Sequence, residues 1–159
     1  MPAGRRSEIR YVLDVNVVAI YLVENHPGYA YVTELLDSLI KDNAKFVLFD
    51  FLPLRVYWIM THKWKVSRDE ARESLLSFLG LPNLIFACID ADDILDAFKL
   101  AQELHHDVFD VIYLVLARNT RARGIITTDT DFETLCGSVG IEYLNPIPKH
   151  ILKKFASFR

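Results

Sequence analysis

The chain has 159 residues, a length typical of one compact domain. It is 52% hydrophobic and 25% charged, with six Gly and six Pro, which excludes collagenous, low-complexity and disordered proteins. Its formal net charge of −3 excludes a strong overall attraction to nucleic acid. The two cysteines, Cys88 and Cys136, form no closely spaced pair. They therefore predict neither a disulfide framework nor a thiolate zinc site, and they favour a reducing compartment.

Basic residues gather in three places: Arg5, Arg6 and Arg10; Arg118, Arg121 and Arg123; and Lys149, Lys153, Lys154 and Arg159. We expect residues 1–8 and 148–159 to be short, exposed basic tails on a single domain that spans residues 1–159. The alternative is a basic rim that contacts phosphates. No stretch resembles a signal peptide or approaches the roughly 18 apolar residues of a membrane span. The sequence thus predicts a soluble cytoplasmic protein with no membrane partner.

The first half of the chain alternates short apolar runs with helical patterns. We predict strands over 11–13 and 45–49, and helices over 17–23, 29–40 and from about 53 to 62. The capping box Ser67-Arg68-Asp69-Glu70 opens a further helix, which ends near Gly80. The first strand therefore delivers Asp14 to its carboxyl end.

The second half continues the alternation. The apolar run 84–89 is typical of a strand buried on both faces. Four acidic residues between 90 and 96 suit a helix start better than a metal site, because the helix dipole attracts acidic residues. We also predict a helix that reaches His105, an apolar helix over 110–118, a strand over 124–127, a short helix over 131–136 and a final strand over 141–144.

Strands that alternate with helices predict an α/β fold, in which helices cover both faces of a central parallel sheet. Functional groups of such folds gather beyond the carboxyl ends of the strands. Asp14 follows the first predicted strand and Asp129 follows the fourth. Because we expect these two strands to be neighbours, the two acids should lie at the same edge of the sheet.

Three acids, Asp14, Asp110 and Asp129, adjoin apolar sequence that should be buried. A buried carboxylate is costly unless it is paired, protonated or bound to a cation. Each acid taken alone could equally be a helix cap or a turn residue. Taken together they favour a divalent-cation site, and all-oxygen ligands suit Mg²⁺ or Mn²⁺. Such a site can activate water and clamp a phosphodiester, which is the chemistry of a hydrolytic nuclease.

Three segments carry a family resemblance: Leu13-Asp14-Val15-Asn16, the helix Asp110-Val111-Ile112-Tyr113-Leu114-Val115-Leu116-Ala117, and Ile125-Ile126-Thr127-Thr128-Asp129-Thr130-Asp131-Phe132. In this order and spacing they resemble the PIN-domain family, particularly its VapC-type toxin ribonucleases. The resemblance extends from about residue 9 to 147. It implies a three-layer α/β/α sandwich, Mg²⁺- or Mn²⁺-dependent cleavage of RNA, a homodimer and often a cognate antitoxin protein.

The resemblance also implies roles for individual residues. Asp14, Asp110 and Asp129 match the first, third and fourth acids of the family, and would be catalytic and bind the metal. Asp131 matches a frequent additional acid and would help to bind the metal. Supporting polar positions are matched by Asn16 and by Thr127 or Thr128. We assign Asn16 and Thr128 to hold the cation's water or the scissile phosphate.

Arg55 is where the sequence departs from the family. It occupies the register of the usual second acid, a Glu early in the helix after the second strand. A guanidinium there could neutralise the other acids and weaken metal binding, or it could bind a phosphate. Asp50 could replace the missing acid, although it could equally cap the helix. The alternative function is therefore a degenerate PIN module that binds RNA or a protein partner without cutting it.

Other features carry less weight. His106 and Asp110 would share a helix face if that helix began early enough, but a surface pair is the simpler interpretation. The aromatic residues Tyr57, Trp58 and Trp64 could stack on bases, although core or dimer packing is the more common use. A phosphohydrolase with Asp14 as nucleophile is a third, weaker hypothesis, because no partner lysine motif is evident.

Overall fold

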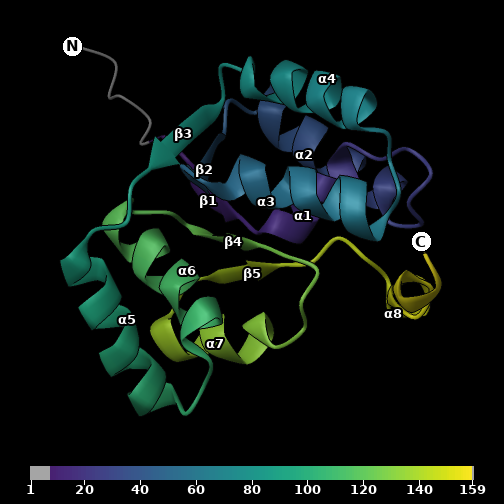
Figure 1. Cartoon of the computed structure of the whole chain (residues 1–159). Coiled ribbons are helices and arrows are strands. Elements are labelled where there is room, and N and C mark those ends of the chain that lie inside the picture. Colours follow the sequence, from purple (N-terminus) through teal and green to yellow (C-terminus); the bar gives the residue numbers. More distant parts are fainter. Residues whose placement is uncertain (1–7, 159) are drawn as a thin grey trace.

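Five parallel strands form the centre of the protein (Figure 1). The computed structural model describes residues 8–158, and the strand order of its sheet is β3-β2-β1-β4-β5. The strands are β1 (Arg10–Leu13), β2 (Lys45–Phe49), β3 (Leu84–Ala87), β4 (Gly124–Ile126) and β5 (Glu142–Leu144). Every neighbouring pair is parallel, which confirms the predicted sheet.

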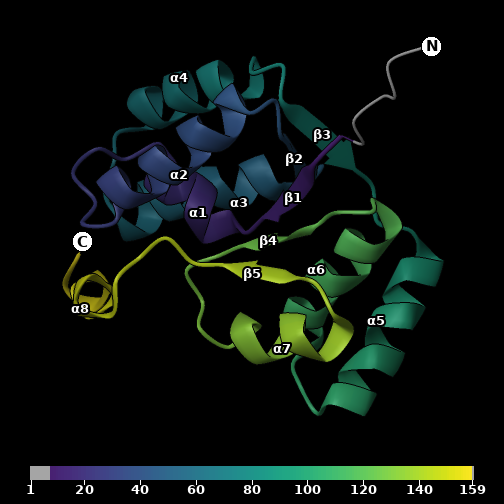
Figure 2. The ribbon, with the colours of Figure 1, turned by 180° about the vertical axis from the view of Figure 1, so that it is seen from behind.

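Helices cover both faces of this sheet. They are α1 (Val15–Tyr21), α2 (Tyr29–Lys41), α3 (Leu52–Trp58), the π-helix η1 (Ile59–Lys63), α4 (Arg68–Leu79), α5 (Ala91–Leu104), α6 (Val108–Asn119), α7 (Phe132–Val139), α8 (Lys149–Leu152) and the 3-10 helix η2 (Phe155–Ser157). Helices α1–α4 lie on one face and α5–α7 on the other, as opposite views show (Figures 1 and 2). The three-layer α/β/α prediction is therefore confirmed.

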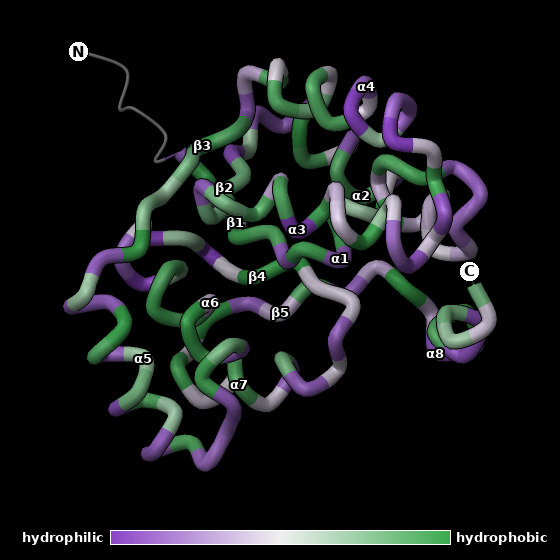
Figure 3. The backbone as a smooth tube through the Cα atoms, viewed as in Figure 1, coloured by the Kyte–Doolittle hydropathy of each residue, from purple (hydrophilic) through white to green (hydrophobic). Residues whose placement is uncertain are grey.

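The apolar runs of β1, β2 and β4 are buried between the two helical layers. In Figure 3 these strands, α1 and much of α6 are coloured as hydrophobic, whereas charged residues colour the outer side of α5. Strand β3 differs from the prediction, because it is an edge strand whose Phe86 is 46% exposed. It also ends at Ala87, before Ile89. The apolar run was therefore wrongly interpreted as a strand buried on both faces.

The strand order reverses beside β1. The chain builds β1, β2 and β3 in one direction across the sheet, and then returns to place β4 on the other side of β1. The N–H of Asp14 donates to the carbonyl oxygen of Ile126 at 3.1 Å, which extends this pairing to the strand end. In parallel α/β sheets, the crevice beyond the carboxyl ends at such a reversal is the usual ligand site.

Acidic residues cap the helices that follow β3. Asp90 and Asp93 form a reciprocal capping box at the start of α5, which confirms that the acidic run there is a helix start. At α6 the cap is Asp107, whose carboxylate accepts the N–H of Phe109 at 2.7 Å. The helix consequently begins two residues earlier than predicted, and Asp110 stands within its first turn.

The segment after β2 is not one continuous α-helix, as the sequence predicted. The α-helix ends at Trp58, and residues Ile59–Lys63 continue as a π-helix. The N–H of Trp64 donates to the carbonyl oxygen of Ile59 at 3.1 Å, five residues earlier. This wider turn changes the direction in which the following side chains point.

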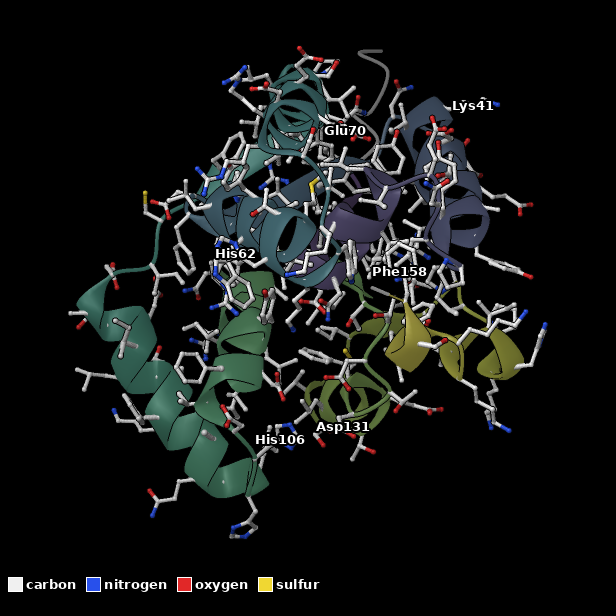
Figure 4. All side chains as sticks on the ribbon, turned by 45° about the vertical axis from the view of Figure 1, so that its right-hand side comes forward. Lys41, His62, Glu70, His106, Asp131 and Phe158 are labelled. Carbon is white, nitrogen blue, oxygen red and sulfur yellow. The ribbon has the colours of Figure 1, made fainter. Side chains whose placement is uncertain are left out.

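The C-terminal segment packs against the body of the protein. Phe155 and Phe158 contact the ring of His26, with ring centroids 4.6 and 4.7 Å away, and Trp64 lies at 4.7 Å from the same ring. The labelled Phe158 is visible in Figure 4. The lysines of this segment are exposed, but its apolar side is anchored. Residues 1–7 of the predicted N-terminal tail, and Arg159, lie outside the described part of the chain.

No helix within residues 8–158 is long and apolar enough to cross a membrane. Helix α1 contains apolar residues, such as Ile20, that could belong either to the core or to a dimer surface. Ile20 is only 1% exposed and belongs to the core, so it cannot contribute to such a surface.

Gly124 allows close approach of β4 and β5. A Cβ atom at this position would overlap the carbonyl oxygen and Cβ of Glu142, and backbone cannot move aside cheaply. We expect Gly124→Ala to lower the free energy of unfolding by about 1–3 kcal/mol in urea titrations. Gly137→Ala is the matched control, because the space around Gly137 is open and Ala favours helix α7 by roughly 0.5–1 kcal/mol. Equal midpoints for the two variants would contradict this packing argument.

His26 makes folding stability depend on pH. Burial lowers the pKa of His26 to about 4, from a usual 6.5, and its Nδ1 accepts the N–H of Gly28 at 3.0 Å. Below pH 6.5 the unfolded chain takes up a proton that the folded chain resists. Stability is therefore complete above pH 6.5 and falls by up to about 3 kcal/mol towards pH 4.

Urea unfolding between pH 7.5 and 4 tests this dependence. His26→Asn keeps an acceptor for Gly28 but cannot be protonated in this range, so its stability should depend less on pH than that of the wild type. The exposed His150 provides the control, and His150→Asn should keep the wild-type dependence. Identical pH profiles for all three proteins would show that His26 does not carry the effect.

Candidate carboxylate site

Asp14 lies directly after the central strand β1 and is 6% exposed. The hydroxyl of Thr127 donates to its Oδ2 at 2.8 Å. Burial raises the pKa of Asp14, while hydrogen bonding from Thr127 opposes that rise because it favours the charged form. The negative charge of Asp129 raises the pKa further. Asp14 is thus a buried carboxylate with polar support but without an ion-pair partner within residues 8–158.

Tyr113 of α6 stands beside Asp14. No role at the site was assigned to it from the sequence. Its pKa is raised, first by burial and then by the negative charge of Asp14, while the positive charge of Arg55 acts in the opposite direction. The phenol therefore stays protonated and lowers the pKa of Asp14 by hydrogen bonding. Its position at the fourth residue of the apolar helix, three residues after Asp110, was the available signal.

One hydroxyl connects the first and fourth acids. Thr127 Oγ1 donates to Asp14 and accepts the backbone N–H of Asp129 at 3.0 Å. Asp129 Oδ1 in turn accepts the N–H of Asp131 at 2.9 Å, which fixes the turn before α7. Thr127, rather than Thr128, is therefore the direct support of Asp14.

Asp110 reaches the site from α6. Its Oδ2 lies 2.9 Å from His106 Nε2, and the two side chains are 31% and 26% exposed. The pair forms although α6 begins after His106, because the residues preceding the helix place the ring beside its first turn. One carboxylate oxygen of Asp110 is thus engaged by an imidazole.

A pocket of about 410 Å³ brings the three predicted catalytic acids together. Asp14, Asp110 and Asp129 line it, as do the predicted binding residues Asn16 and Arg55. The structure does not bring Asp131 or Thr128 into this pocket. Asp131 is exposed, and Thr128 lines a neighbouring pocket that also contains Asn16.

Arg55 lines the carboxylate pocket but does not form an ion pair with its acids. It is exposed and makes no ion pair within 4.0 Å with a carboxylate of residues 8–158. Asp50 is exposed near Cys88, whose pKa it raises, and it is not among the residues that line the pocket. The structure therefore gives no support to Asp50 as the missing acid.

The pocket suits a hard cation such as Mg²⁺, because its three acids offer carboxylate oxygens as ligands. Within residues 8–158, however, no three His, Cys, Asp or Glu side chains converge closely enough to hold an ion by themselves. A cation would have to complete its coordination with water. The assignment of metal ligands to Asp14, Asp110, Asp129 and Asp131 stays a prediction.

The basic cluster of Arg118, Arg121 and Arg123 lies at the opposite edge of the sheet from the carboxylate pocket. Arg121 and Arg123 precede β4 and line a pocket at the amino ends of the strands, together with Arg10. Arg118 pairs with Asp96 at 2.8 Å and Arg123 with Glu142 at 2.8 Å. These arginines therefore lie at the edge of the sheet opposite the acids, and two of them are partly neutralised, so the alternative of a phosphate-contacting rim stays a prediction.

The buried charge of Asp14 has a measurable cost. Because the pKa of Asp14 is raised, its contribution to stability is present at low pH and is lost as the pH rises and the carboxylate ionises. Asp14→Asn removes the charge and keeps an acceptor for Thr127. We expect a higher urea midpoint than wild type at neutral pH in EDTA, and a smaller difference at pH 4. Asp131→Asn, at an exposed acid, should leave the midpoint unchanged; an equal gain there would refute the burial argument.

Comparisons with known proteins agree with this architecture. The VapC20 toxin of Mycobacterium tuberculosis, which cleaves the sarcin-ricin loop, has 12% sequence identity and a TM-score of 0.63, covering 79% of this chain and 94% of its own. VapBC2 of Rickettsia felis, bound to promoter DNA, has 17% identity and a TM-score of 0.63, covering 86% and 98%. A toxin–antitoxin complex from Klebsiella pneumoniae has 19% identity and a TM-score of 0.58, covering 86% and 98%.

These likenesses concern the fold, because the identities are low. No curated protein sequence matches the chain significantly. The family model described as the PIN domain, by contrast, matches residues 11–137, which include β1 from its second residue, all of β4 and all three acids that line the carboxylate pocket. The chain therefore belongs to the PIN-domain family.

Proposed function

We propose that this protein is a metal-dependent endoribonuclease of the VapC type. The observation that carries the proposal is the convergence of Asp14, Asp110 and Asp129, from two strand ends and one helix, on a single pocket. That pocket lies at the carboxyl edge of the sheet, where strand order reverses beside β1. Membership of the PIN family supports nuclease chemistry there.

Mg²⁺ or Mn²⁺ is the proposed cofactor. Asp14 and Asp129 would hold the cation with water, with Asp110 and the nearby Asp131 as further oxygen donors. When bound, such a cation activates water and clamps the phosphodiester for in-line attack. A cation would also neutralise the buried charge of Asp14, which the described residues leave without an ion pair.

The chain's own residues orient these groups. Thr127 holds the Asp14 carboxylate and the Asp129 backbone in one arrangement, so neither has to be ordered when substrate arrives. Tyr113 favours the ionised form of Asp14 by hydrogen bonding. Asn16 and Arg55 line the pocket and would contact the phosphate, for which a guanidinium is well suited.

We also propose RNA as substrate and an antitoxin as protein partner. VapC20 is a toxin that cleaves the sarcin-ricin loop, and the neighbours from Rickettsia and Klebsiella are toxin–antitoxin complexes. This chain covers nearly the full length of each neighbouring chain. We therefore propose that it is the toxin and that a separate antitoxin protein binds it. Homodimerisation and a cytoplasmic location belong to this proposal.

The second candidate is a PIN module that binds without cutting. Arg55 in place of an acid is the observation that favours it, because a cation beside the carboxylates weakens metal binding. The absence of an Arg55 ion pair with any carboxylate of residues 8–158 weighs against it. The nuclease is therefore the better-supported function.

Cleavage of a mixed single-stranded RNA in Mn²⁺ tests the proposal. Wild-type protein should cleave, and Asp14→Ala, purified identically, should reduce the rate at least about 100-fold because it removes a metal ligand. Asp50→Ala is the matched control, since this exposed acid lies outside the pocket and its loss should not change the rate. No cleavage above the Asp14→Ala level by folded wild type would reject the nuclease.

Arg55→Glu separates the two candidates in the same assay. If the wild type is an active nuclease, this variant should bind Mn²⁺ more tightly and still cleave, at a lower rate because it loses the phosphate contact of Arg55. If only Arg55→Glu cleaves, the wild type is the degenerate binding module. Binding of Mn²⁺ measured by calorimetry provides the readout that does not depend on turnover.

A further inference from the structure

An aromatic and basic surface adjoins the carboxylate pocket along α3 and η1. Phe51, Leu54, Arg55, Trp58 and Lys63 line a second pocket of about 600 Å³, which we call the α3–η1 surface. Its apolar members are strongly exposed: Leu54 at 73%, Phe51 at 49% and Trp58 at 45%. Phe51 and Arg55 also line the carboxylate pocket, so the two pockets lie side by side.

The π-helix builds the centre of this surface. His62 stacks on Trp58 with ring centroids 5.3 Å apart and planes inclined by 13°. Lys63 Nζ lies 5.9 Å from the Trp58 ring centroid. Residues four and five positions after Trp58 both reach its ring because the turn widens to i→i+5 hydrogen bonding. Figure 4 labels His62 at this end of α3.

A third pocket, of about 520 Å³, continues the surface. Lys63 lines both it and the α3–η1 surface, and Asn16 connects it to the carboxylate pocket. His62 and Lys65 line it too. No acidic residue within the described chain lines this pocket or the α3–η1 surface. Of these three pockets only the carboxylate pocket is lined by acids, and the two beside it are lined by the cations Arg55, Lys63 and Lys65.

We infer that the α3–η1 surface binds unpaired nucleobases of single-stranded RNA whose backbone passes through the carboxylate pocket. This inference rests on the proposed function and names a base-binding site for its substrate. Exposed aromatic rings with cations between them match a polyanion that has flat apolar faces. Arg55 and Lys63 contact phosphates, while Trp58 and Phe51 stack on bases. A duplex hides these base faces, so the surface selects single strands.

Binding of fluorescein-labelled single-stranded RNA, followed by anisotropy in EDTA, tests the inference without any cleavage. Trp58→Ala should weaken binding about 10-fold, the loss expected for one stacked base, and Trp58→Phe should retain most of the affinity. Phe98→Ala is the matched control, because Phe98 is a 59% exposed aromatic on α5 outside all three pockets. Its affinity should equal that of wild type.

An abasic strand of the same length separates stacking from charge. Trp58→Ala should bind it as wild type does, whereas Lys63→Gln should weaken both strands and reduce the slope of log affinity against log salt by about one. Phe51→Ala is a second aromatic variant in case Trp58→Ala fails to fold by circular dichroism, and it should also weaken only the strand with bases.

Three results would overturn the inference: Trp58 and Phe51 variants that bind like Phe98→Ala, an equal loss on the abasic strand, or equal affinity for a duplex. The last two would identify an unselective phosphate surface. The cleavage assay and the binding assay test the two proposals separately. Active cleavage with aromatic-independent binding rejects only this inference, whereas aromatic-dependent binding without cleavage rejects only the nuclease.

Discussion

The buried carboxylate of Asp14, at the end of the central strand, is the constraint on which the site depends. A charge in that position is unfavourable in an apolar core. Thr127 donates a hydrogen bond that reduces this cost, and the phenol of Tyr113 also lowers the pKa of Asp14, but within residues 8–158 no cation pairs with it. Structural stability alone gives no reason to keep an acid there. The proposed divalent cation would supply such a reason, because it would neutralise the unpaired charge.

Sheet topology supplies the remaining geometry. Because the strand order reverses beside β1, the ends of β1 and β4 face the same crevice, and α6 delivers a third acid to it from the opposite layer. Thr127 connects two of these elements through one hydroxyl, which both donates and accepts. A shift of either strand by one residue would separate the acids. The site is therefore as rigid as the ladder between its two central strands.

Much of this arrangement was predictable from the sequence, and the exceptions have physical causes. Alternating apolar runs and helical patterns identify the layers, and the placement of Asp14, Asp110 and Asp129 identifies the pocket. The partial exposure of β3 was not predictable, since an apolar run does not reveal which strand lies at the edge of the sheet. Nor was the choice of Thr127 over Thr128, because successive side chains in the extended chain after β4 point to opposite sides and the strand end decides which one meets Asp14. The distant placement of Arg121 and Arg123 follows from strand direction, which places residues before a strand at the edge opposite its following acid.

The π-helix after α3 shows how a local backbone change alters the surroundings of a site. A continuous α-helix to His62 would turn Lys63 away from Trp58, because residues five apart lie on different sides of an α-helix. The wider turn gathers Trp58, His62 and Lys63 instead. In α3, Arg55 supplies a cation at the wall of the carboxylate pocket, yet it forms no ion pair with a carboxylate of residues 8–158. Its charge consequently adds to those of Lys63 and Lys65 and brings a cation to that wall.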